Sequence, residues 1–103
     1  MRRLIINADD LGLTRGVNRA ILQAHHQGVV TSTTLMANSR GFEDAVQVVR
    51  GAERLGVGCH VVLIDGEPLL DAAQVKTLLA GNGTGRRFRD GFVEFARRAL
   101  QGR

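Results

Sequence analysis

The chain opens with a short apolar run and then changes abruptly to polar residues. Residues 4–6, Leu-Ile-Ile, are typical of a parallel-sheet strand that is covered on both faces. Asp9 and Asp10 then fall at the carboxyl end of this predicted strand. Thr14 is a favourable N-cap and Gly28 a favourable stop, so a helix is predicted between them. Its apolar positions at helical spacing are Val17, Ala20, Ile21 and Ala24.

The same strand-then-helix pattern repeats along the next 40 or so residues. Residues 29–36, VVTSTTLM, are rich in β-branched side chains and predict a second strand, which the following ANSRG interrupts. A second helix is predicted to run to Leu55 and to end at Gly56. Its apolar stripe consists of Phe42, Ala45, Val46 and Val49. Residues 57–64 predict a third strand, and the following DGEP is a turn by composition.

The last 40 or so residues carry a weaker pattern. A helix is predicted around residues 72–80, and GNGTG at 81–85 predicts a flexible glycine-rich loop. Residues 86–103 predict a basic terminal helix in which Glu94 and Arg98 can pair four positions apart. Its apolar face consists of Phe92, Phe95, Ala96 and Ala99.

Alternating strands and helices with short connections predict an α/β fold with parallel strands and right-handed crossovers. We expect residues 1–103 to form a single partial domain, because three strands leave both sheet edges open. Folded proteins avoid open edges by adding strands, closing a barrel or pairing with another chain. The chain therefore has the pattern of part of a larger fold.

Composition narrows the range of functions. Hydrophobic residues make up 44% of 103, which suits one small globular domain. Lys and Arg outnumber Asp and Glu by 14 to 10, with many of the arginines late in the chain, but Trp and Tyr are absent, so a nucleic-acid platform is not expected. The single cysteine, Cys59, suits a reducing compartment and is expected to be a buried structural residue. With no membrane-span or signal pattern, the sequence predicts a cytoplasmic protein.

Three residues are candidates for chemistry. Asp9 and Asp10 follow the first predicted strand, and His60 lies in the third, so the carboxyl edge of a parallel sheet could bring them together. Two carboxylates and an imidazole suit a divalent metal site with a position left open for water. Since neighbouring residues of an extended chain point in different directions, one Asp could bind the ion while the other takes a proton.

Each candidate also has an ordinary structural interpretation. Asp-Asp after a strand is as common in caps and turns as in catalysis, and a lone His among apolar residues is usually a hydrogen-bonded core residue. His25 and His26 at the end of the first helix suit its negative dipole end. The hydroxyls of residues 31–34 are explained by strand propensity, and the late arginines by a solvated surface. GNGTG lacks the Lys-Ser/Thr of a phosphate-binding loop.

Four motifs occur in order along residues 4–70: NADD, GVNRAI, GVVTSTTLMAN and GVGCH. In this combination the chain resembles the start of a YdjC-like carbohydrate deacetylase, a family that includes chitooligosaccharide deacetylases and hopanoid-biosynthesis deacetylases. The wording HVVLIDGEP is closer to the hopanoid-associated branch. The resemblance implies the N-terminal three strand–helix units of a distorted TIM-like (β/α) barrel, here an incomplete parallel barrel.

The resemblance also implies an activity and residue roles. The activity is metal-dependent removal of an N-acetyl group from an amino sugar or glycolipid, with zinc or magnesium at the barrel mouth. Asp9 matches the general base, and Asp10 and His60 match metal ligands. The family supplies another metal-binding histidine from a later segment, whereas this sequence has no histidine after His60. We therefore expect this polypeptide alone to be weakly active or inactive.

Two other functions fit the same residues. A non-catalytic α/β module could have lost the metal site and assemble as a homo-oligomer, or with a partner, through its open sheet edges. The basic late segment could also bind an anionic ligand, with a strong dependence on salt.

Overall fold

The computed structural model describes residues 2–89 and 91–102, and it divides the chain into two compact units, residues 1–61 and 62–103. The first unit is a three-stranded parallel sheet in the order β1-β2-β3 with two helices. Its strands are β1 (Asn7–Leu11), β2 (Ser32–Leu35) and β3 (Gly56–Cys59), and its helices are α1 (Arg15–Gln27) and α2 (Phe42–Arg50). The predicted α/β alternation with parallel strands is confirmed.

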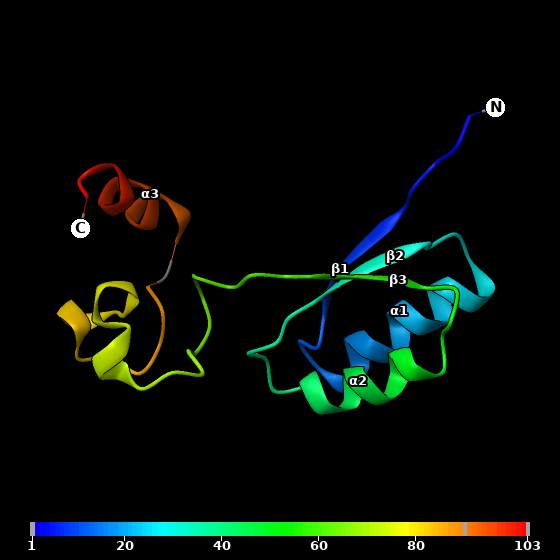
Figure 1. Ribbon diagram of the computed structural model, residues 1–103, viewed down its shortest axis with the longest axis horizontal. Helices are drawn as coiled ribbons and strands as arrows, with labels where there is room; N and C mark the ends of the chain where they lie inside the picture. The colour runs from blue at the N-terminus through cyan, green and yellow to red at the C-terminus, as the bar shows by residue number, and fades with distance from the viewer. Residues whose placement is uncertain (1, 90, 103) are drawn as a thin grey trace. The chain divides into compact units, whose positions relative to one another are not determined.

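Both helices cover one face of the sheet, and no other described element of this unit covers the opposite face, which we call the open face (Figure 1). The core between the sheet and the helices is small, because its buried cluster consists of Leu11 of β1, Ile21 of α1 and Ala45 of α2. Partly buried side chains of Ala8, Val17, Leu35 and Val49 pack against it. Polar side chains of β1 and β2 therefore have the open face available to them.

The ends of α1 agree with the sequence. Thr14 is the N-cap, with its hydroxyl accepting a hydrogen bond from the Val17 amide at 3.2 Å, and Gly28 is the C-cap. Helix α2 is shorter than predicted: it ends at Arg50 with Gly51 as its C-cap. The chain between α2 and β3 forms turns that bury Ala52 and Leu55, so these apolar residues belong to a packed turn rather than to the helix.

The prediction that residues 4–6 form a doubly covered strand is wrong. The strand begins at Asn7, and the side chains of Leu4 and Ile5 are 78% and 77% exposed. The first strand starts at Asn7 because its neighbour β2 begins only at Ser32, which lies opposite Asn7. Strands β2 and β3 are likewise shorter than residues 29–36 and 57–64.

Cys59 is exposed, so its predicted burial is also wrong. It lies on β3, an edge strand whose four residues are all exposed. Sequence hydrophobicity cannot tell an edge strand from a central one, because burial depends on the neighbouring strand.

Residues 62–103 contain little regular structure. The predicted helix at 72–80 is instead two 3₁₀ turns, η1 (Ala72–Gln74) and η2 (Lys76–Leu78), interrupted at Val75, whose φ of −125° is not helical. A third, η3 (Gly81–Gly83), lies within the predicted glycine-rich loop. Leu79 and Phe88 pair as an antiparallel bridge, and both are buried.

The terminal helix is shorter than residues 86–103. Helix α3 (Phe92–Leu100) begins after a segment in which Arg87 and Arg89 form backbone hydrogen bonds with Ala80 and Leu78, so this segment is extended rather than helical. Positions 90 and 103 of the predicted helix lie outside the described residues. Over residues 2–89 and 91–102, no helix is long and apolar enough to cross a membrane.

Glu94 binds two arginines on α3. Its carboxylate accepts a hydrogen bond from Arg98 Nε at 2.8 Å, which confirms the predicted pair, and it lies 3.2 Å from Arg97 Nε. The hydrogen bonds from Arg97 and Arg98 lower the pKa of Glu94 from 4.5 to about 2.

We expect α3 to lose helicity as the pH falls from about 4.5 towards 2. Because the pKa of Glu94 is lower in the folded state, its ion pairs stabilise the helix above the unfolded pKa and are lost as the folded carboxylate takes up a proton. Circular dichroism against pH measures this loss. Glu94→Gln should flatten the curve in this range, whereas Glu43→Gln, at an exposed position of α2, should not; equal curves for both variants would contradict the assignment.

Candidate functional site

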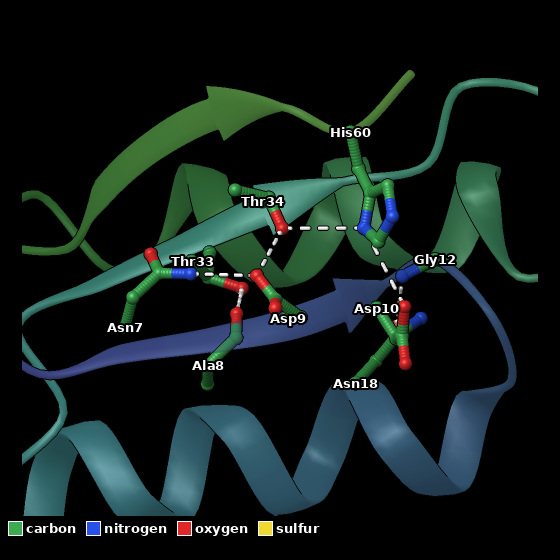
Figure 2. A network of polar contacts seen from close by, with 9 residues as sticks. All are labelled: Asn7, Ala8, Asp9, Asp10, Gly12, Asn18, Thr33, Thr34 and His60. Atoms are coloured by element: carbon green, nitrogen blue, oxygen red, sulfur yellow. Dashed lines mark hydrogen bonds and ion pairs between the residues drawn. The ribbon is translucent and has the colours of Figure 1, made fainter. Parts of the chain in front are cut away.

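A bulge in β1 presents the two adjacent aspartates. Ala8 pairs with Thr33 and Leu11 with Leu35, so Asp9 and Asp10 together lie opposite one residue of β2. Asp10 takes up the extra residue with a left-handed backbone, at φ 66°, which Asp tolerates better than most residues. The expected strand alternation is therefore interrupted here, and both carboxylates reach one polar cluster (Figure 2).

Asp9 is held by neighbours on the open face of the sheet. Its Oδ1 accepts hydrogen bonds from Asn7 Nδ2 at 2.7 Å and from Thr34 Oγ1 at 2.9 Å. Asn7 is fixed in turn, since its Oδ1 accepts a hydrogen bond from Ser32 Oγ at 2.7 Å. Both of these hydrogen bonds go to Oδ1, and none of the described residues donates a hydrogen bond to Oδ2. The carboxylate is thus oriented with one oxygen bound and the other able to accept a proton.

His60 meets Asp10 at the carboxyl edge of the sheet. It follows the last residue of β3 rather than lying within the strand, and its amide donates to Leu35 O at 2.9 Å. Its Nδ1 lies 3.4 Å from Asp10 Oδ1 and 3.3 Å from Thr34 Oγ1. Although β2 separates β1 from β3, the imidazole reaches across it to the aspartate (Figure 2).

The pair of Asp10 and His60 suits a divalent ion in its donor chemistry. Carboxylate oxygen and imidazole nitrogen are ordinary zinc ligands at about 2.0–2.2 Å, and two such atoms around one ion can be separated by the 3.4 Å seen here. Their side chains are half and one-third exposed, so an ion could enter from solvent. No group of three potential ligands occurs among residues 2–89 and 91–102, so this part of the chain offers two donors rather than a complete site.

Asn18 is a structural centre of the site that the sequence analysis did not single out. It is fully buried in α1, and its Oδ1 accepts a hydrogen bond from the Gly12 amide at 2.7 Å. Its Nδ2 donates to Gly41 O at 3.0 Å and to Asp44 Oδ2 at 2.8 Å. Asn18 thereby joins the loop after β1 to the loop before α2. The signal in the sequence was an asparagine, a poor helix former, within the first turns of a helix.

Two glycines allow these loops to meet. The Gly41 amide donates to Gly12 O at 2.8 Å. A Cβ at Gly41 would lie 2.7 Å from that same oxygen, and one at Gly12, where φ is 98°, would lie 2.9 Å from Met36 O. Any larger residue at either position would push the loop after β1, which follows Asp10, away from the segment that it contacts.

The other candidates lie elsewhere. His25 and His26 are in the last turn of α1, where His25 Nδ1 lies 2.8 Å from Val30 O, in agreement with a structural role. They line a hollow of about 790 Å³ together with the residues around Gly28 and Gly51. None of Asp9, Asp10 and His60 lines this hollow, so its size does not bear on their chemistry.

The backbone at Asp10 gives a test of the bulge. We expect Asp10→Gly to be more stable than Asp10→Ala by about 1 kcal/mol, because glycine adopts the left-handed backbone without the Cβ penalty. In a regular strand the order reverses, since glycine there costs about 0.5–1 kcal/mol relative to alanine. Urea unfolding of both variants, compared with the same pair at Thr34 on β2, measures the difference. The same order at both positions would exclude the bulge geometry.

Comparison with known proteins agrees with these motifs. Residues 3–102 match the family model described as YdjC-like protein. A carbohydrate deacetylase of Brevibacillus brevis is 47% identical over 91 residues, covering 88% of this chain and 36% of the relative. A chitooligosaccharide deacetylase of Proteus mirabilis is 50% identical over 66 residues, covering 64% and 26% respectively.

A solved structure has the same fold. The crystal structure of an Enterococcus faecalis V583 protein assigned to cellobiose-phosphate cleavage superposes with a TM-score of 0.78 at 36% identity, over 89% of this chain and 35% of the other. The chain thus spans about a quarter to a third of the length of these relatives. The resemblance seen in the four sequence motifs is confirmed: the chain belongs to the YdjC-like family.

Proposed function

We propose that the chain is the N-terminal part of a metal-dependent deacetylase that hydrolyses the N-acetyl group of an amino sugar or glycolipid. The observation that carries the proposal is the convergence of Asp9, Asp10 and His60 at the carboxyl edge of a parallel sheet, where Thr34 contacts Asp9 and His60, and His60 contacts Asp10. Functional groups of parallel α/β proteins collect at this edge. Relatives named carbohydrate deacetylase and chitooligosaccharide deacetylase support the choice of reaction.

In this proposal Asp10 and His60 would hold the divalent ion, zinc or magnesium. Such an ion supplies a Lewis acid for the acetamide carbonyl and lowers the pKa of a bound water. Thr34 lies between the base and the imidazole, with its hydroxyl 2.9 Å from Asp9 Oδ1 and 3.3 Å from His60 Nδ1. The backbone bulge at Asp10 holds its carboxylate against the imidazole.

Asp9 is the general base. Asn7 and Thr34 fix one of its oxygens, so the other can accept a proton from the attacking water. As the water oxygen bonds to the acyl carbon and the C–N bond breaks, that proton is passed on to the leaving amine. Acetate and a free amino sugar result.

The relatives are about three times as long as this chain. In this proposal the remaining metal ligand and most of the barrel would come from a segment that corresponds to the rest of their length. Two protein ligands leave most of the coordination sphere to water, which weakens binding. We therefore propose that the chain of 103 residues is weakly active or inactive alone. Acetate release from chitooligosaccharides at the rate of the Proteus mirabilis relative would refute this.

Metal binding tests the site directly. We expect isothermal calorimetry with zinc and with magnesium to show one ion bound per chain. Asp10→Asn and His60→Ala should each lower the affinity by about 100-fold, since each removes one of two ligands. His26→Ala, an exposed histidine of α1, is the matched control and should bind as the unchanged chain does. Equal affinity for all variants would place the ion elsewhere, and no binding at all would favour the non-catalytic module.

The open edges at β1 and β3 also fit a homo-oligomer. This arrangement would pair an exposed strand with a second copy. Light scattering on the same samples measures the mass, and a monodisperse monomer would exclude it.

A further inference from the structure

The second unit contains a small, partly open cavity that the proposed deacetylase site does not use. Its volume is about 170 Å³, and its walls come from η2, from the extended segment before α3 and from α3 itself. That space corresponds to roughly five or six water molecules at about 30 Å³ each. The lining residues are Thr77, Leu78, Arg89, Phe95, Arg98 and Ala99.

Arg89 brings an unsatisfied donor to this cavity. Its Nε atom is buried and has no hydrogen-bond partner among the described residues. The backbone beneath it is fixed on both sides, because its amide donates to Leu78 O at 3.1 Å and its carbonyl accepts from Asp65 N at 3.3 Å. A buried guanidinium N–H without an acceptor is unfavourable, so the position calls for an oxygen atom from a ligand or a water.

The charge around the cavity is positive. Arg98, the second arginine that lines it, already donates from Nε to Glu94 Oε1 at 2.8 Å. Glu94 also pairs with Arg97, so its single negative charge is shared by two arginines. It therefore does not balance the charge of Arg89. Among the described residues that line the cavity, none is acidic. The missing acceptor is therefore expected to carry negative charge.

We propose that this cavity binds a small carboxylate with a short aliphatic part, of the size of acetate. The Nε–H of a guanidinium lies beside an Nη–H, and this edge matches the two oxygens of a carboxylate. Leu78, Phe95 and Ala99 offer apolar contact to a methyl or methylene group. Phosphate fits less well, because its third and fourth oxygens would meet these apolar walls without donors.

The test follows the Arg89 Nε–H resonance of the 103-residue chain by ¹H–¹⁵N correlation spectroscopy. Sodium acetate is titrated against sodium chloride at constant ionic strength, and sodium phosphate forms a parallel series. We expect a saturable shift of this resonance with acetate, and a weaker response to phosphate. Arg89→Met should weaken acetate binding by about tenfold or more, as read from the neighbouring amide of Leu78.

Arg87→Met is the matched control, because Arg87 is two positions away, exposed, and does not line the cavity. It should leave acetate binding within about twofold of the unchanged chain. The titration of the unchanged chain decides the proposal even if a variant fails to fold. A resonance that does not respond to acetate, that exchanges only with water, or that saturates with phosphate at lower concentration would overturn it.

Discussion

Replacing Asn18 with alanine is expected to lower the free energy of unfolding of residues 1–61 by about 3–5 kcal/mol. The substitution removes three hydrogen bonds and leaves the amide of Gly12 buried without its partner, whereas the carbonyl of Gly41 keeps the hydrogen bond from the Ala45 amide. The orphaned amide costs about 1–3 kcal/mol, and each of the two other lost hydrogen bonds contributes about 0.5–1.5 kcal/mol. Since small domains are stable by only about 5–15 kcal/mol, this one side chain accounts for a large share.

Urea unfolding followed by circular dichroism measures the effect. Gln23→Ala is the matched control, because Gln23 is an amide on the same helix but is exposed, and its side chain donates to Gln27 one turn away. It should change stability by no more than about 0.5 kcal/mol. A loss below about 1 kcal/mol for Asn18→Ala would mean that water replaces the side chain and that the two loops are held by other contacts.

The convergence of Asp9, Asp10 and His60 could be predicted because it follows from a general property of parallel sheets. Residues that end successive strands meet at one edge, whatever the exact strand lengths. The predicted third strand was longer and contained His60. In the structure His60 lies one residue after β3, and it still contacts Asp10. The roles of the three residues remain a proposal that the metal titration tests.

The bulge at Asp10 could not be predicted in the same way. A bulge is a property of two strands in register, and nothing within NADD shows that two of its residues lie opposite one residue of β2. The importance of Asn18 depends likewise on two loops that are distant in sequence, at Gly12 and Gly41. Local patterns predict elements and caps, such as Thr14, but not contacts between loops.

Burial was predicted least well, because it depends on which faces are covered. Residues 4–6 and Cys59 have the composition of a strand interior, but they lie beyond the paired region and on an edge strand. The helix predicted at residues 72–80 failed for a related reason. Its apolar residue Leu79 is buried by pairing with Phe88 rather than by packing of a helical face.

Leu4 and Leu11 are the same residue type but differ in burial, so they allow the effect of burial on stability to be measured. Leu11 ends β1 and is fully buried in the core with Ile21 and Ala45, whereas Leu4 is 78% exposed. We expect Leu11→Ala to destabilise residues 1–61 by about 3–4 kcal/mol, through lost apolar contact and the cavity left behind. Because so few buried residues make up this core, its neighbours have little freedom to fill the space.

Leu4→Ala makes the same chemical change at an exposed position and should alter stability by no more than about 0.5 kcal/mol. Urea unfolding of both variants, read at a common temperature, gives the comparison. Equal losses would show that residues 4–6 are covered in solution, as their composition suggested. A large loss for Leu11 alone would establish that the stability of this unit rests on the end of β1, directly beside the aspartates.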